Sequence, residues 1–186
     1  MTDKLTVSRA AKALLCALAL LGATLLAAPA HASSVPSDFA VRGILSPDRP
    51  LGPRDYVWDA TGVPAGPTRV VVDLSAKMLY VYRGGIEIGR TYIIYGADDK
   101  PTPTGVFPIL QKKRHHVSNL YGAPMPYMMR LTWDGIAIHE SSVEADAATH
   151  GCIGIPQEFA AELFREARLG DKVLVTRGWM RAAYGR

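Results

Sequence analysis

Three short segments rich in β-branched and aromatic residues follow one another between residues 69 and 95, and turn signals separate them. The first segment is RVVVDL at 69–74, and Ser75-Ala76 separates it from KMLYVYR at 77–83. Gly84-Gly85 then precedes IEIGRTYIIY at 86–95. Such segments are typical of strands, and short connections join antiparallel neighbours. The pattern therefore predicts two successive hairpins in an antiparallel sheet.

The remaining elements are weaker strand patterns and a single helix pattern. Strands are expected at 106–110, on either side of Asp134-Gly135 within 131–139, and at 171–176. Residues 156–169 carry apolar side chains at helical spacing, with Pro156 near the start and Gly170 as a stop. With about seven strand patterns and one helix, the fold class is predicted to be mainly β with one packed helix.

Residues 1–32 have the layout of a secretory signal peptide. Three basic residues precede an apolar run at 13–28, and Ala30 and Ala32 offer cleavage sites. The run is too short and too rich in Ala for a confident membrane span. We therefore expect cleavage, no stable membrane span afterwards, and an exported protein of the periplasm or cell envelope. An uncleaved N-terminal anchor is the alternative.

The chain beyond the signal peptide is predicted to be one domain with two flanking segments. Residues 33–68 form a Pro- and Gly-rich arm in which Tyr56-Val-Trp58 can be buried. The domain follows at 69–177, and 178–186 is a C-terminal tail. Without residues 1–32, the 21 Lys+Arg and 17 Asp+Glu fall to 18 and 16, a net charge of +2. We therefore expect no nucleic-acid partner, and a monomer.

Cys152 is the single cysteine that remains once Cys16 leaves with the signal peptide, so no internal disulfide can form. It stands two residues after His150 and 13 after His139. A thiol attacks as thiolate, and a nearby imidazole can take its proton or, once charged, stabilise the thiolate. A lone cysteine among histidines in an exported protein is better explained by reactivity than by packing.

The residues around Cys152 suit acyl transfer. If Cys152 follows a tight turn at Gly151, the backbone N–H groups of both residues can stabilise an oxyanion. Because glycine has no Cβ, Gly151 lets a substrate carbonyl approach closely. The expected chemistry is thiolate attack on an amide carbonyl, a thioester intermediate, and attack by an amine or water.

These residues resemble the signature of the L,D-transpeptidase family, the YkuD-type catalytic domain of bacterial cell-wall enzymes. THGCI at 149–153 follows His139, and similar segments occur at 71–82, 103–105 (PTG), 123–127 (APMPY) and 131–139. The resemblance implies a β-sandwich-like fold and acyl transfer from a peptidoglycan stem tetrapeptide to an amine acceptor. It implies no cofactor and no metal, and carbapenem-type inhibitors are expected to add to the cysteine.

The resemblance also assigns roles by position. It implies that Cys152 is the nucleophile, His139 the base, His150 a positioning residue, and Gly151 with Cys152 part of the oxyanion hole. The segment 111–129 is predicted to be a long loop, and the resemblance makes it a lid, in which Tyr121 and Tyr127 are candidate substrate contacts. His115-His116 are assigned to its solvated part.

Two residues depart from the family pattern. Gly154, a candidate substrate-binding position, stands where Arg or Asn is common, so no side chain there can orient the stem-peptide carboxylate. Glu140 follows His139 where a small residue is common. A carboxylate beside the imidazole would raise its basicity, and it would also repel a thiolate.

Three alternatives use the same residues. A zinc site could be formed by His139, His150 and Cys152, with water as the fourth ligand. However, no CxxC or HxxxH spacing supports a zinc site. A carboxypeptidase would pass the same acyl group to water, and a protein lysine as acceptor would anchor an envelope protein. A catalytically weak wall-binding protein is the third alternative, suggested by Gly154 and Glu140.

Overall fold

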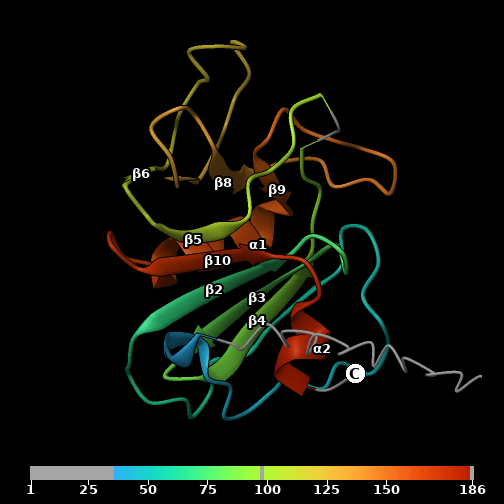
Figure 1. Cartoon of the computed structure of the whole chain (residues 1–186), viewed down its shortest axis with the longest axis vertical. Coiled ribbons are helices and arrows are strands. Elements are labelled where there is room, and N and C mark those ends of the chain that lie inside the picture. The colour runs from blue at the N-terminus through green and yellow to red at the C-terminus, as the bar shows by residue number, and fades with distance from the viewer. Residues whose placement is uncertain (1–35, 97–98, 185–186) are drawn as a thin grey trace, which may run out of the picture. The chain divides into compact units, whose positions relative to one another are not determined.

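The computed structural model describes residues 36–96 and 99–184, so the predicted signal peptide lies outside the described residues. Two sheets dominate these residues, which confirms the mainly β prediction (Figure 1). The six-stranded sheet contains, in spatial order, β1 (Tyr56–Trp58), β4 (Ile86–Tyr92), β3 (Met78–Arg83), β2 (Thr68–Asp73), β10 (Lys172–Thr176) and β5 (Gly105–Pro108). The four-stranded sheet contains β6 (Gln111–Lys113), β7 (Met128–Arg130), β8 (Ala137–Glu140) and β9 (Ile153–Ile155). The helices are η1, a 3-10 turn (Ser37–Phe39), α1 (Gln157–Glu166) and α2 (Trp179–Tyr184).

Both sheets are mixed, which corrects the prediction of an antiparallel sheet. The two predicted hairpins exist, because β2 pairs with β3 and β3 with β4 in antiparallel register. However, β10 runs parallel to β2, and β9 runs parallel to β8. Parallel neighbours require a long crossover connection. The sequence therefore contains no local turn signal that predicts these two parallel pairs.

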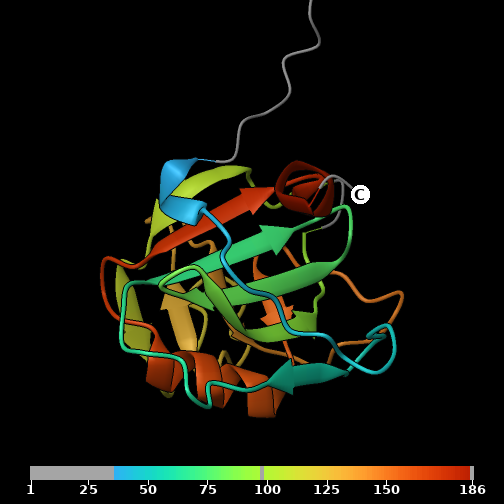
Figure 2. The ribbon, with the colours of Figure 1, turned by 90° about the horizontal axis from the view of Figure 1, so that it is seen from below.

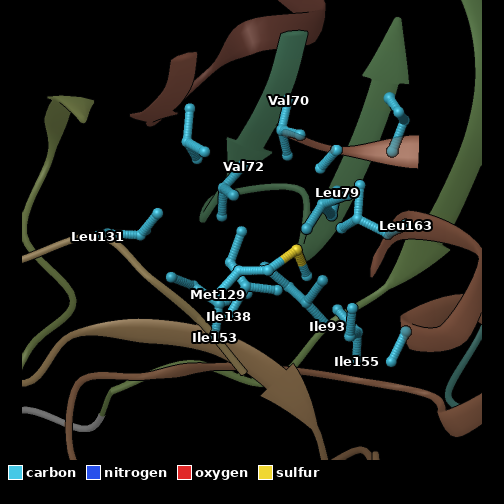
Figure 3. Close-up of a cluster of buried hydrophobic side chains, with 14 of the residues drawn as sticks. Val70, Val72, Leu79, Ile93, Met129, Leu131, Ile138, Ile153, Ile155 and Leu163 are labelled. Carbon is cyan, nitrogen blue, oxygen red and sulfur yellow. The ribbon is translucent and has the colours of Figure 1, made fainter. Parts of the chain in front are cut away.

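The main core lies between the two sheets (Figure 3). Because strand side chains alternate between faces, each sheet turns every second residue toward this core. It is built from fully buried side chains of the large sheet, the small sheet and α1, including Val70, Val72, Leu79, Met129, Ile138, Ile153, Ile155, Phe159 and Leu163. The helix predicted at 156–169 is thus confirmed as α1, packed against the sheets.

The outer face of the six-stranded sheet carries a second cluster. Val71 and Tyr82 project from this face and pack with Phe39 of the arm and Trp179 of α2. The arm crosses this face, and α2 lies beside it (Figure 2). The indole N–H of Trp179 donates to the Tyr82 hydroxyl at 3.0 Å. The predicted tail therefore contains a docked helix that the sequence analysis missed.

The arm also extends the six-stranded sheet, through the Tyr56-Val-Trp58 segment that was expected to be buried. β1 pairs with β4 at the edge of the sheet, and Trp58 meets Phe159 edge to face at 5.2 Å. The buried Glu87 carboxylate on β4 pairs with Arg90 at 2.7 Å and accepts the Leu45 N–H at 3.0 Å. The arm is therefore bonded to the domain along much of its length.

The segment predicted as a long loop at 111–129 is a hairpin-like flap. It begins with β6 and ends in β7, and these strands pair. Between them, the N–H groups of Tyr127, Met125 and Ser118 donate to the carbonyls of Arg114, His116 and Ala123. The prolines at 124 and 126 alternate with the donors and so do not interrupt the pairing. We call residues 114–127 the flap; it projects at the top of Figure 1.

The hairpin predicted within 131–139 is shifted toward the N-terminus. Its first strand is β7 at Met128–Arg130, and the residues around Asp134-Gly135 form the turn before β8. Among the described residues, no helix has the length and apolar character needed to cross a membrane.

Candidate active site

A cavity of about 540 Å³ lies between the flap, the outer face of the four-stranded sheet and the turn before β9. Four of the predicted site residues line it, namely Cys152, His139, His150 and Tyr121. Two residues without a predicted role, His116 and Arg130, also line it.

Strand register brings Cys152 and His139 to the same wall of this cavity. In the parallel pair of β8 and β9, Ile138 lies beside Ile153, and His139 lies beside Gly154. Ile138 and Ile153 are buried in the core between the sheets. Because alternate residues point to opposite faces, His139 and Cys152 both point away from that core.

One ring nitrogen of His139 is hydrogen-bonded to the backbone, and this bond fixes the tautomer of the imidazole. Nδ1 lies 2.6 Å from the carbonyl oxygen of Glu140, so Nδ1–H is the donor and Nε2 keeps its lone pair. The residue is 8% exposed, and burial lowers the pKa of His139 despite the Glu140 carbonyl, which raises it. His139 is therefore a neutral base at pH 7.

Glu140 acts on His139 through its backbone, which corrects the expectation for its carboxylate. The contact to Nδ1 comes from the carbonyl oxygen. Since neighbouring residues of a strand point to opposite faces, the Glu140 side chain is directed away from the imidazole. The predicted repulsion between this carboxylate and a thiolate has no structural basis.

Cys152 is half-buried, and its sulfur rests among backbone groups of the turn into β8. The Sγ–H donates to the Gly135 carbonyl at 3.5 Å. Burial raises the pKa of the Cys152 thiol, although the Ala137 N–H and the charges of Arg130 and Lys100 act to lower it. The resting group is therefore a thiol.

Two threonines hold the turn that presents Cys152. The Thr149 hydroxyl donates to the Cys152 carbonyl at 2.5 Å. The buried Thr102 hydroxyl donates to the Gly151 carbonyl and accepts the Gly96 N–H, both at 2.9 Å. Thr102 belongs to the PTPTG turn at 101–105. Sequence reasoning missed its role as a brace, because its partners are distant in the chain.

Gly151 is required by its own backbone and by its neighbour Ile136. Its φ is +99°, a region that other residues rarely adopt. A Cβ at this position would lie 2.7 Å from Cδ1 of Ile136. Ile136 therefore occupies the side of Gly151 where space for a substrate carbonyl was predicted.

His150 and Tyr121 form one wall of the cavity together. Their rings stack with centroids 4.7 Å apart, and Lys100 Nζ donates to the Tyr121 hydroxyl at 2.7 Å. The flap is thus held against the turn that carries Cys152. Tyr121 is placed where a substrate contact was predicted.

Two other predicted contacts lie away from the cavity. Tyr127 packs edge to face on Phe164 at 5.8 Å and does not line the cavity. Gly154 lies beside His139, but Ile94 and Ser141 fill the space above it: a Cβ would meet them at 2.7 and 2.8 Å. The Arg or Asn side chain common in the family pattern has no room here.

His116 corrects the assignment of His115-His116 to solvent. His115 is exposed, whereas His116 is half-buried and lines the cavity. Burial lowers the pKa of His116, and the charges of Lys113 and Arg130 lower it further. No sequence signal distinguishes the two histidines, because the flap pairing decides which one faces inward.

The described residues do not support the zinc alternative. Across 36–96 and 99–184, no three His, Cys, Asp or Glu side chains gather closely enough to hold a metal ion. His139, His150 and Cys152 share a cavity without converging on one point as zinc ligands do.

Comparisons with known proteins concern the family of this chain. The L,D-transpeptidase 1 of Mycobacterium tuberculosis is 30% identical over 122 residues, covering 56% of this chain and 49% of that protein. The chain therefore spans about half the length of this curated relative. A crystal structure of a cysteine-to-serine mutant of the Enterococcus faecium L,D-transpeptidase is 30% identical, with a TM-score of 0.54, covering 60% of this chain and 50% of that one. The structure of the LD transpeptidase LdtMt1 in complex with imipenem is 26% identical, with a TM-score of 0.55 and 58% coverage of both chains.

The family pattern called YkuD, the L,D-transpeptidase catalytic domain, matches residues 67–175. This match includes the cavity wall formed by β7, β8 and β9, together with the PTPTG turn and α1. Since it covers more than half of the chain, the chain belongs to the YkuD family of L,D-transpeptidase catalytic domains, as the sequence resemblance predicted.

Proposed function

We propose that this protein is a peptidoglycan L,D-transpeptidase in which Cys152 is the acylated nucleophile. The observation that carries the proposal is that a half-buried thiol and a neutral imidazole line one wall of the same cavity. His139 is pinned through Nδ1, so its free Nε2 is available to accept a proton. Acyl transfer needs a nucleophile beside a base whose orientation is fixed by a hydrogen bond.

The reaction follows from the neutral resting state. Nε2 of His139 takes the Sγ proton as sulfur attacks the carbonyl of the third stem residue. Backbone N–H groups at 151–152 stabilise the oxyanion. The bond to the terminal D-alanine breaks, and that amine leaves with the proton from His139. An acceptor amine then attacks the thioester and restores the thiol.

The proposed place of action is the cell envelope, after export. Support comes from the signal-like residues 1–32 and from the family's substrate. The acceptor is proposed to be a second stem peptide, which gives a cross-link. Water as acceptor gives carboxypeptidase products, and a protein lysine gives an anchored protein, so mass spectrometry of muropeptide products separates the three.

The test uses imipenem, because a related LD transpeptidase has been solved in complex with it. Intact mass spectrometry should show one covalent adduct on the wild type and none on Cys152→Ala. His139→Ala should slow adduct formation by about 100-fold or more. The control is His115→Ala, an exposed flap position outside the cavity, which should react like the wild type. An adduct on Cys152→Ala, or none on the wild type, would overturn the proposal.

A further inference from the structure

Arg130 occupies the same row of the four-stranded sheet as Cys152. Arg130 of β7 lies directly beside Ala137 of β8. Ile138 lies beside Ile153, so continuing that register by one residue places Cys152 beside Ala137 on its other side. All three side chains point away from the core between the sheets. Arg130, Ala137 and Cys152 all line the cavity, although Met125 and Met128 pack against Ala137.

Within the described part of the chain, the guanidinium of Arg130 has no acidic partner. The residue is half-buried, and its Nε donates to the amide oxygen of Gln111 at 3.3 Å. None of the ion pairs formed by residues 36–96 and 99–184 includes Arg130. Asp134 lines the same cavity without pairing with it. A partly desolvated cation without a counter-ion is costly, so the cavity favours an anionic ligand at this point.

Arg130 lies close to the reacting groups. Its positive charge lowers the pKa of Cys152 and also that of His116, although burial is the larger influence on both. His116 reaches the cavity from the flap, whereas Arg130 reaches it from the sheet. An anion bound by Arg130 would therefore lie next to the sulfur and within the influence of His116.

We propose that Arg130, with His116 on the opposite wall, forms a subsite for the carboxylate of the leaving D-amino acid. The inference rests on the proposed function, which makes the acyl donor a peptide ending in a free carboxylate next to the scissile bond. A planar guanidinium binds such a carboxylate through two parallel hydrogen bonds. Gly154, the family position expected to orient a carboxylate, carries no side chain and is covered by Ile94 and Ser141. Arg130 supplies that function from a neighbouring strand.

The experiment compares two acyl donors, a stem tetrapeptide ending in D-alanine and the same peptide ending in D-alaninamide. The wild type should prefer the acid by about 10- to 100-fold in kcat/KM, the range expected for a hydrogen-bonded charge. Arg130→Gln should bring that ratio close to one, Arg130→Lys should keep part of it, and His116→Gln should reduce it. The ratio is informative because a change in fold or in the thiol pKa affects both donors alike.

The matched control is Arg114→Gln, since Arg114 is an exposed flap arginine outside the cavity, lying over the Tyr127 ring. Its acid-to-amide ratio should equal that of the wild type. A wild-type ratio near one, or an unchanged ratio in Arg130→Gln, would overturn the subsite.

A binding measurement keeps this inference separate from the proposed function. Calorimetry with Cys152→Ala should show tighter binding of the acid than of the amide, and Arg130→Gln in that background should remove the difference. If the wild type turns over neither donor while iodoacetamide still modifies Cys152, the proposed function fails. Equal binding of acid and amide by Cys152→Ala would refute the carboxylate subsite whatever the turnover.

Discussion

At the scale of residues, the two side chains that are proposed to react rest in their neutral forms. Burial lowers the pKa of His139 and raises the pKa of Cys152, and each shift disfavours the charged form. The sequence left two alternatives, namely proton transfer to a neutral imidazole and a preformed thiolate–imidazolium pair. The second alternative is disfavoured. In the proposed reaction, His139 instead serves as a general base that takes the proton while sulfur attacks.

This resting state predicts the pH dependence of Cys152 chemistry. Because the folded pKa of His139 lies below the ordinary 6.5, acylation by the stem peptide should persist as pH falls through 6.5 and decline only below it. Alkylation by iodoacetamide, measured by intact mass without substrate, should rise with pH and reach half its maximum above 9.0, the ordinary thiol value. A plateau of alkylation near neutral pH would indicate a preformed thiolate and contradict this assignment.

At the scale of elements, the strand β9 and its two neighbours hold the proposed nucleophile. Cys152 directly precedes β9. The segment around Ile94 bonds to Gly154 on one edge of β9, and β8 bonds to the other edge. Thr102 ties the PTPTG turn to the carbonyl of Gly151. The position of the sulfur therefore depends on a hydroxyl that never faces the cavity.

Thr102→Val tests this brace. The change keeps the shape but leaves the Gly96 N–H and the Gly151 carbonyl without their partner, which costs about 1–3 kcal/mol of unfolding free energy per buried group. Imipenem acylation should slow by about tenfold or more, since small displacements of a reacting group are costly. Thr102→Ser, which retains the hydroxyl, should keep most of the wild-type rate and stability. Equal acylation rates for the Val and Ser variants would show that the brace does not position Cys152.

At the scale of the whole domain, stability and chemistry occupy different faces. The core between the sheets and the Tyr82–Trp179 cluster on the outer face of the large sheet supply most of the buried apolar surface. The cavity lies on the outer face of the small sheet, under the flap. Changes in the Trp179 cluster should therefore alter unfolding without altering the reaction.

Trp179→Ala checks that separation. Trp179 is 1% exposed and bonded to Tyr82, so its truncation should cost about 3–5 kcal/mol in chemical denaturation. The folded variant should react with imipenem at the wild-type rate. Trp133→Ala, at a tryptophan that is 74% exposed, should change stability by about 0.5 kcal/mol or less. A large loss of acylation in folded Trp179→Ala would contradict the proposed separation.

The sequence by itself determined the local elements and indicated the residues that are proposed to react. The alternation in 69–95 and the helical spacing after Pro156 encode the hairpins and α1, because these periods depend only on neighbouring residues. The motif around Cys152, with His139 upstream, indicated the family that the comparisons confirm. Strands and helices can be predicted from such patterns because their backbone geometry repeats over a few residues.

Only the tertiary structure decided which distant residues meet. The parallel pairing of β8 with β9 puts His139 and Cys152 on one wall, and the flap pairing turns His116 inward. The register of β7 adds Arg130 to the row of Cys152, while Ile94 and Ser141 close the space above Gly154. The physical reason is that strand register and packing join segments far apart in the chain, and local sequence patterns carry no information about such contacts.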